Sequence, residues 1–154
     1  MPARSSENHI DSASILLVDD NRYGLTARKS VLQELGYRIT ICTDPLQAVE
    51  IFRANAFDLV VTDYKMPRLN GGQLIAAMRE LRAETPFILL TGFAESLGFT
   101  EEGTGADLVI QKSSNEVVQL VRAVARLLKK TPSRKTQAKA KPPLRGVARA
   151  KGVS

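Results

Sequence analysis

The sequence predicts an α/β fold: a doubly wound, five-stranded parallel sheet with helices packed on both of its faces. Short apolar runs alternate five times along the chain with longer segments whose apolar residues recur at helical spacing. Several of the runs are apolar on both faces, as strands covered by two helical layers must be. Strands joined by helical crossovers are normally parallel with right-handed connections, so the order of the segments predicts the fold class.

The first two strand–helix units have clear ends. Residues 14–20 (SILLVDD) form an apolar run that ends in two acids, and residues 23–35 then carry Leu and Val at helical spacing until Gly36 ends the helix. Residues 38–43 (RITICT) alternate between apolar and polar side chains, as a strand does. Asp44 is a good N-cap for the next helix because a proline follows it in the first helical position.

The remaining three units follow the same pattern. Residues 57–63 (FDLVVTD), 86–92 (PFILLTG) and 106–112 (ADLVIQK) are the expected third, fourth and fifth strands. A helix is predicted to begin at the glycine pair 71–72, which lacks the Lys and Ser/Thr of a phosphate-binding loop. The last helix is predicted at residues 113–128, where Ser113 and Glu116 have the spacing of a capping box.

The charge of the chain is unevenly distributed. The formal net charge is +6, but nine of the 22 Lys and Arg lie in residues 129–154, which contain no acid, so residues 1–128 hold 13 basic and 16 acidic residues. The basic tail has three prolines and no aromatic residue, and it cannot bury enough apolar surface to offset the entropy of ordering. We therefore expect a flexible segment at residues 1–13, one folded domain at residues 14–130, and a disordered basic tail at residues 131–154.

Composition also argues against several classes of protein. No apolar run is long enough to span a bilayer, and the first 14 residues lack the apolar stretch of a secretory signal, so we expect a cytoplasmic protein. The lone cysteine, Cys42, excludes an internal disulfide and is expected to be a small buried residue. The only histidine, His9, lies in the N-terminal segment without a predicted partner.

Polar residues at the ends of the predicted strands form the candidate site. In a doubly wound sheet, ligands bind beyond the carboxyl ends of the strands. Three carboxylates gathered there repel one another unless a cation is present, and oxygen ligands favour Mg²⁺. A lysine can pair with a phosphoryl oxygen, a hydroxyl can donate a hydrogen bond, and an aspartate can accept a phosphoryl group. The residues at these ends are Asp19, Asp20, Asp63, Thr91 and Lys112.

The segments LLVDD, FDLVVTDYKMPRLNG, LLTG and GADLVIQK, with the helix entries between them, resemble the receiver domain of bacterial two-component response regulators over roughly Ser14 to Lys130. The resemblance implies a (βα)5 flavodoxin-like fold with strand order 2-1-3-4-5. It also implies that a sensor histidine kinase phosphorylates Asp63 in the presence of Mg²⁺. We expect a stand-alone receiver that signals by protein–protein contact and is not an enzyme, although it assists its own phosphotransfer and dephosphorylation.

The resemblance further implies a role for each site residue. Thr91 would be the switch hydroxyl, and Lys112 would contact the phosphoryl group. Lys65 and Phe93, each two residues beyond Asp63 and Thr91 respectively, border the path of an attacking water and can tune the lifetime of the phosphoryl group. The implied metal ligands are Asp20, Asp63 and the backbone carbonyl of Lys65, with Asp19 acting through water.

The sequence departs from the family pattern in three places. Receivers usually carry Tyr or Phe three residues before the lysine, but this position is Val109, so coupling to the distal face is expected to be weak or to pass through Phe93 or the backbone. Ser113 replaces the usual proline, and because a non-proline cis bond costs about 2.5–4 kcal/mol we predict a trans bond before it. Residues 93–106 hold three glycines, so the fourth helix should be short, irregular or mobile.

Other functions are compatible with parts of the sequence. A phosphatase of the haloacid-dehalogenase type also uses a strand-end aspartate, but it places the nucleophile on the first strand with a second Asp two residues later, whereas position 65 here is Lys. The basic tail could give weak, non-specific nucleic-acid contact, although a solvated tail is the simpler interpretation. A degenerate receiver would act as a phosphorylation-independent binding module. Asp44 and Asp58 are interpreted as a helix cap and a strand-opening residue.

Overall fold

Five parallel strands form one sheet in the order β2-β1-β3-β4-β5, which confirms the fold class and the strand order that the resemblance implied. The computed structural model describes residues 12–92 and 101–130 of the chain. The described residues up to Val124 belong to one compact unit, and the description that follows concerns that unit. The strands are β1 (Ser14–Val18), β2 (Arg38–Cys42), β3 (Leu59–Asp63), β4 (Phe87–Thr91) and β5 (Leu108–Gln111).

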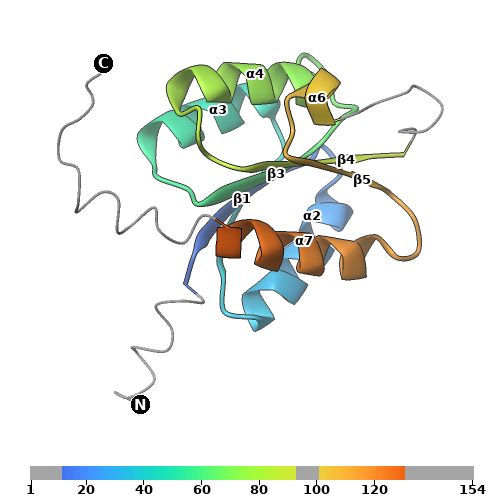
Figure 1. Cartoon of the computed structure of the whole chain (residues 1–154). Helices are drawn as coiled ribbons and strands as arrows, with labels where there is room; N and C mark the ends of the chain where they lie inside the picture. The colour runs from blue at the N-terminus through green and yellow to red at the C-terminus, as the bar shows by residue number, and fades with distance from the viewer. Residues whose placement is uncertain (1–11, 93–100, 131–154) are drawn as a thin grey trace, which may run out of the picture. The chain divides into compact units, whose positions relative to one another are not determined.

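Helices cover both faces of the sheet, as the apolar strands require. In Figure 1, α3, α4 and α6 lie on one face, while α2 and the first turns of α7 lie on the other. The bounds of these helices are α2 (Arg22–Glu34), α3 (Pro45–Ala54), α4 (Gly71–Leu81), α6 (Glu101–Thr104) and α7 (Glu116–Lys130).

Burial differs between the central strands and the edge strand β2. Every residue of β3 and β4 is buried, while β2 alternates between exposed and partly buried positions until it ends at Cys42. On the face covered by α3 and α4, the large core side chains include Phe52, Phe87 and Met78. The sheet is therefore fixed on both faces near the centre, where the carboxyl ends of β1, β3 and β4 come together.

Helix capping confirms one sequence prediction and corrects another. Asp44 Oδ1 accepts a hydrogen bond from the Leu46 amide at the start of α3, as predicted. The capping box expected at Ser113 is wrong, because α7 begins only at Glu116 and the Ser113 hydroxyl accepts from the Asn115 amide, while the Glu116 carboxylate accepts from Arg28. A capping box that the sequence analysis did not identify lies at the start of α4, between Asn70 and Gln73.

Glycines end two elements where the backbone must turn. Gly36 follows α2 with a φ of 102°, and Gly105 follows α6 with a φ of 82°, a region that L side chains rarely adopt. The described part of the fourth-helix region holds only the four-residue helix α6, in agreement with the short helix predicted there. The peptide bond before Ser113 is trans, as expected, because no cis bond occurs among the described residues.

Two polar residues have the structural roles predicted for them. The Cys42 thiol is buried, and Sγ donates a hydrogen bond to the carbonyl of Asp44. Burial raises the pKa of the Cys42 thiol, which argues against a reactive thiolate. Asp58 Oδ2 accepts from the amide of Ser14 and holds the start of β1. The expectations for residues 1–11 and 131–154 lie outside the described part of the chain, as does Phe93.

Candidate functional site

The strand-end residues meet at the carboxyl edge of the sheet. Asp19 follows β1, Asp63 is the last residue of β3, Thr91 is the last residue of β4, and Lys112 follows β5 directly. The parallel registers of β1 with β3, β3 with β4 and β4 with β5 bring these ends side by side. Residues more than 90 positions apart in the sequence therefore share one site, as the topology of a doubly wound sheet predicts.

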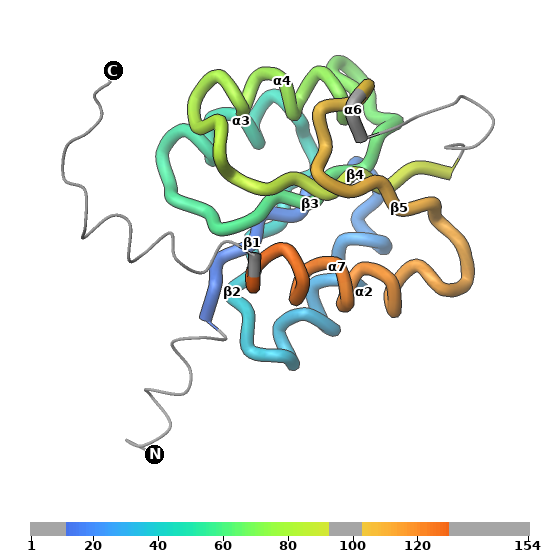
Figure 2. Tube along the Cα trace, in the orientation of Figure 1, coloured from blue at the N-terminus to red at the C-terminus, as the bar shows by residue number. Residues whose placement is uncertain are grey.

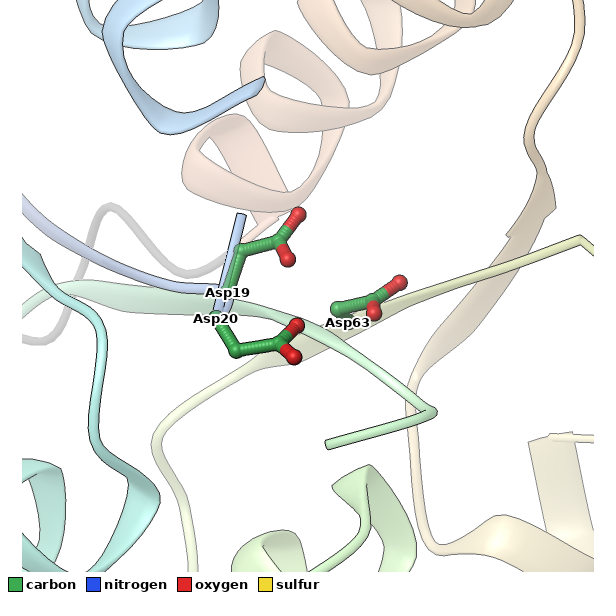
Figure 3. A group of neighbouring side chains, drawn as sticks. All are labelled: Asp19, Asp20 and Asp63. Atoms are coloured by element: carbon green, nitrogen blue, oxygen red, sulfur yellow. The ribbon is translucent and has the colours of Figure 1, made fainter. Parts of the chain in front are cut away.

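Three carboxylates form the acidic part of this site. Asp19, Asp20 and Asp63 each place a carboxylate oxygen so that the three oxygens lie within 4.8 Å of one another. Figure 3 shows the two side chains that follow β1 beside the one from β3. Asp19 and Asp63 are buried and Asp20 is exposed, so the acidic cluster has one side open to solvent. We refer to these three residues as the acidic cluster.

Lys112 supplies a positive charge to the cluster. Its Nζ lies 2.6 Å from Asp63 Oδ1 and 3.7 Å from Asp19 Oδ2. The backbone places the lysine there, because the Lys112 amide donates to the carbonyl of Thr91 and continues the pairing of β5 with β4. In this position the ammonium offsets part of the mutual repulsion of the carboxylates.

The protonation of Asp63 responds to this environment. Burial raises the pKa of Asp63 above its ordinary value, because a carboxylate loses solvation in the interior. The hydrogen bond from Lys112 acts in the opposite direction and stabilises the charged form, while the negative charge of Asp19 raises the pKa further. The net effect is a raised pKa, so the ionised form of Asp63 destabilises the folded protein in the absence of a cation.

This pKa shift predicts how stability depends on pH. Since folded Asp63 holds its proton more tightly than the unfolded chain does, its contribution to stability is present below the unfolded value of about 3.9 and is lost as the pH rises through the folded value. With Mg²⁺ removed by a chelator, we expect Asp63→Asn to be more stable than wild type at pH 7, with the difference vanishing near pH 3. Urea unfolding of both proteins across this range measures the difference.

The matched control for that measurement is Glu50→Gln. This substitution also removes one carboxylate, but from the exposed surface of α3, where Glu50 pairs with Arg53. A stabilisation at pH 7 that is equal in Asp63→Asn and Glu50→Gln would show that the effect comes from overall charge and not from the acidic cluster.

Sequence analysis missed one residue of the site, Arg28. It is a buried residue of α2, and Nη1 lies 2.9 Å from Asp19 Oδ2 while Nε lies 2.6 Å from Glu116 Oε2. The signal was present in the spacing, because Arg28 lies on the same buried stripe of α2 as Leu25 and Leu32. A charged residue within such a stripe needs a buried partner, and here the partner belongs to the acidic cluster.

The other predicted residues lie near the cluster with different exposures. Thr91 is buried at the end of β4, and Lys65 is exposed in the β3–α4 connection. Val109 is partly buried on β5, opposite Leu89 of β4, and packs against the hydrophobic core. No described helix is both long and apolar enough to cross a membrane.

Comparison with known proteins gives a consistent picture. A family model described as the response regulator receiver domain matches residues 15–125. The transcriptional regulatory protein CpxR of Escherichia coli K12 is 33% identical over 115 residues, which is 73% of this chain and 49% of CpxR. The chain spans smaller fractions of other curated relatives, such as 10% of the autoinducer 1 sensor kinase/phosphatase LuxN of Vibrio campbellii.

Solved structures are similar over most of the described chain. The receiver domain of the sensor histidine kinase PA1611 from Pseudomonas aeruginosa, solved with a magnesium ion coordinated in its active site cleft, matches with a TM-score of 0.69 and 27% identity. That match covers 77% of this chain and 98% of the PA1611 domain. The response regulator TrrA of Thermotoga maritima, in complex with Mg²⁺-BeF, matches with a TM-score of 0.68 and 30% identity, covering 75% of this chain and 99% of TrrA.

Proposed function

The chain belongs to the response regulator receiver family, and we propose that it is a phosphorylation switch in which Asp63 accepts a phosphoryl group from a sensor histidine kinase in the presence of Mg²⁺. The observation that carries this proposal is the position of Asp63. It is a buried carboxylate within 4.8 Å of two other acids, and it lies 2.6 Å from a lysine ammonium. A carboxylate able to act as nucleophile, oxygen donors for a cation and an ammonium for the phosphoryl oxygens thus lie together, which supports the proposal.

The acidic cluster fits a hard divalent cation. Its donors are carboxylate oxygens, the burial of Asp63 leaves a charge that needs compensation, and the exposed side at Asp20 gives an entry path. Asp20, Asp63 and the backbone carbonyl of Lys65 would hold Mg²⁺, with Asp19 acting through water. When bound, the ion neutralises charge that develops on the phosphoryl oxygens.

The transfer follows from the chemistry of the side chains. A carboxylate oxygen of Asp63 attacks phosphorus, the P–N bond to the kinase imidazole breaks, and its electron pair stays on the imidazole nitrogen. Lys112 donates to one phosphoryl oxygen, and the Thr91 hydroxyl donates to another. Attack by water on the resulting acyl phosphate returns the free carboxylate and inorganic phosphate. Lys65 and Phe93 are the positions proposed to tune the rate of that hydrolysis.

The output is proposed to be contact with another protein. Phosphorylation shifts an equilibrium between two states only to the extent that the phosphoryl group interacts better with one of them. Val109 cannot move as an aromatic ring does in other receivers, so the response has to reach the surface by another path. The alternative is a degenerate receiver that binds its partner without phosphorylation.

Amide NMR with beryllofluoride and Mg²⁺ tests the proposed function without a kinase. Beryllofluoride mimics a phosphoryl group on aspartate, so we expect shifts at Asp20, Asp63, Thr91 and Lys112 that extend to Val109. Asp63→Asn serves as the control and should show no response to beryllofluoride. If wild type shows no shifts at the cluster, the phosphorylation-switch proposal is rejected and the result favours a degenerate receiver that acts as a binding module.

A further inference from the structure

Arg28 connects the acidic cluster to the start of α7. The guanidinium lies between two carboxylates, with Nη1 2.9 Å from Asp19 and Nε 2.6 Å from Glu116 in the first turn of α7. Both ion pairs are sheltered from solvent, since the Arg28, Asp19 and Glu116 side chains are 8%, 2% and 13% exposed. The roles proposed for the acidic cluster above do not use this arginine.

The fold makes room for this guanidinium. Gly24 lies one helical turn before Arg28, in the first turn of α2. A Cβ at Gly24 would lie only 3.1 Å from Nη1 of Arg28, the nitrogen that contacts Asp19. A side chain at position 24 would therefore crowd the guanidinium, and glycine leaves the space that Arg28 occupies.

Arg28 and a metal ion would compete for the negative charge of Asp19. The carboxylate of Asp19 attracts a divalent cation in the cluster, whereas the Arg28 guanidinium, which already pairs with Asp19, repels that cation. Glu116 is the other partner of Arg28, so its negative charge offsets part of the guanidinium charge that acts on Asp19 and on a cation beside it. The strength of the Arg28–Glu116 pair and the affinity of the cluster for a cation are then linked, and such a linkage is reciprocal.

We propose that Arg28 is a positioning residue that couples cation occupancy of the acidic cluster to the first turn of α7 through Glu116. This inference rests on the cation site of the proposed function. Through this coupling, a change in cation occupancy of the acidic cluster would reach α7 without movement of the Val109 side chain. The helices involved, α2 and α7, lie on the same face of the sheet (Figure 2).

The first test is a double-mutant cycle read out as Mg²⁺ affinity, with Mg²⁺ alone as the probe in an amide NMR titration. Arg28→Met keeps an unbranched apolar stem but removes the guanidinium and its competing charge, and we expect it to tighten Mg²⁺ binding by about threefold or more. Glu116→Gln leaves Asp19 as the only charged partner of Arg28 in this pair of contacts. More of the guanidinium charge then opposes the cation, so we expect Mg²⁺ binding to weaken by about threefold or more. In the Arg28→Met background, the effect of Glu116→Gln should largely disappear.

The cycle separates coupling from simple loss of charge. A direct electrostatic effect of Glu116 on the cation would persist when Arg28 is absent, whereas an effect transmitted by Arg28 would not. Glu50→Gln, on the exposed surface of α3, controls for the loss of one carboxylate elsewhere. Each variant is first compared with wild type by its amide spectrum, and Glu116→Gln provides an independent arm if Arg28→Met does not fold.

The second readout is the response of α7. Mg²⁺ should shift the amides of Val117 and Val118 in wild type, and these shifts should be lost in Arg28→Met. Equal Mg²⁺ affinity in wild type and Arg28→Met, or an effect of Glu116→Gln that is undiminished without Arg28, would overturn the coupling while leaving the proposed function intact. If Mg²⁺ shifts no amide near Asp20 and Asp63 in wild type, the cation site and the coupling both fail.

Discussion

Asp63→Asn is expected to lose all incorporation of labelled phosphate, whether the donor is a histidine kinase or a small acyl phosphate such as acetyl phosphate. The amide cannot replace the carboxylate as nucleophile, because its oxygen lacks the negative charge that attacks phosphorus. It also removes a charge from the acidic cluster that would hold Mg²⁺. Labelling of purified wild-type and variant protein, followed by electrophoresis, measures the loss.

Asp44→Asn is the matched control for this experiment. It makes the same chemical change at another aspartate, and asparagine caps helices as well as aspartate does, so α3 should be preserved. The label on wild type should be released by hydroxylamine, which cleaves acyl phosphates but not phosphate esters of Ser or Thr. Undiminished labelling of Asp63→Asn, or a label that resists hydroxylamine, would refute the assignment of Asp63.

The strands of the sheet could be predicted because each one is encoded by a short, contiguous run of apolar residues. Apolar runs such as residues 59–63 are buried along their whole length, and the helices between them leave little choice but parallel pairing. The acidic cluster followed from the same topology, since residues at the carboxyl ends of neighbouring parallel strands must lie together. The order of the strands was not accessible from the pattern itself and came from the family resemblance.

Arg28 and Glu116 could not be paired from sequence because 88 residues separate them. The local pattern predicted that Glu116 would complete a capping box with Ser113, which is the usual role of a glutamate at that spacing. A buried guanidinium competes with that role, because leaving it without a carboxylate partner costs more than an unformed cap at an exposed helix end. Tertiary contacts therefore overrode a valid local signal.

Gly71→Ala is expected to destabilise the folded protein strongly and to disturb the position of Asp63. A Cβ at this position would lie 2.5 Å from Leu89 Cδ1 and 2.6 Å from the carbonyl oxygen of Asp63. The Gly71 amide donates to the carbonyl of Tyr64 at 2.7 Å, which holds the start of α4 close to the end of β3. The clash involves backbone atoms that cannot rotate away, so the β3–α4 connection has to move.

Gly71→Ala and Gly72→Ala are expected to change the free energy of unfolding by different amounts. Forcing extra atoms into a packed site typically costs about 1–3 kcal/mol, and we expect Gly71→Ala to lower the free energy of unfolding by about 2 kcal/mol. Gly72→Ala is the matched control, because the atom nearest to its Cβ would be Asn70 Oδ1 at 3.4 Å. Alanine is the better helix former, so Gly72→Ala should be neutral or stabilising by up to about 1 kcal/mol.

Urea unfolding with and without Mg²⁺ distinguishes a general loss of packing from a displacement of Asp63. A ligand that binds only the folded state raises its stability according to the ligand concentration and the dissociation constant. If Gly71 maintains the position of Asp63, Mg²⁺ should stabilise Gly71→Ala less than it stabilises wild type or Gly72→Ala. Equal stabilisation of all three proteins would mean that the glycine serves packing against Leu89 alone, and that the acidic cluster tolerates movement of the chain beside it.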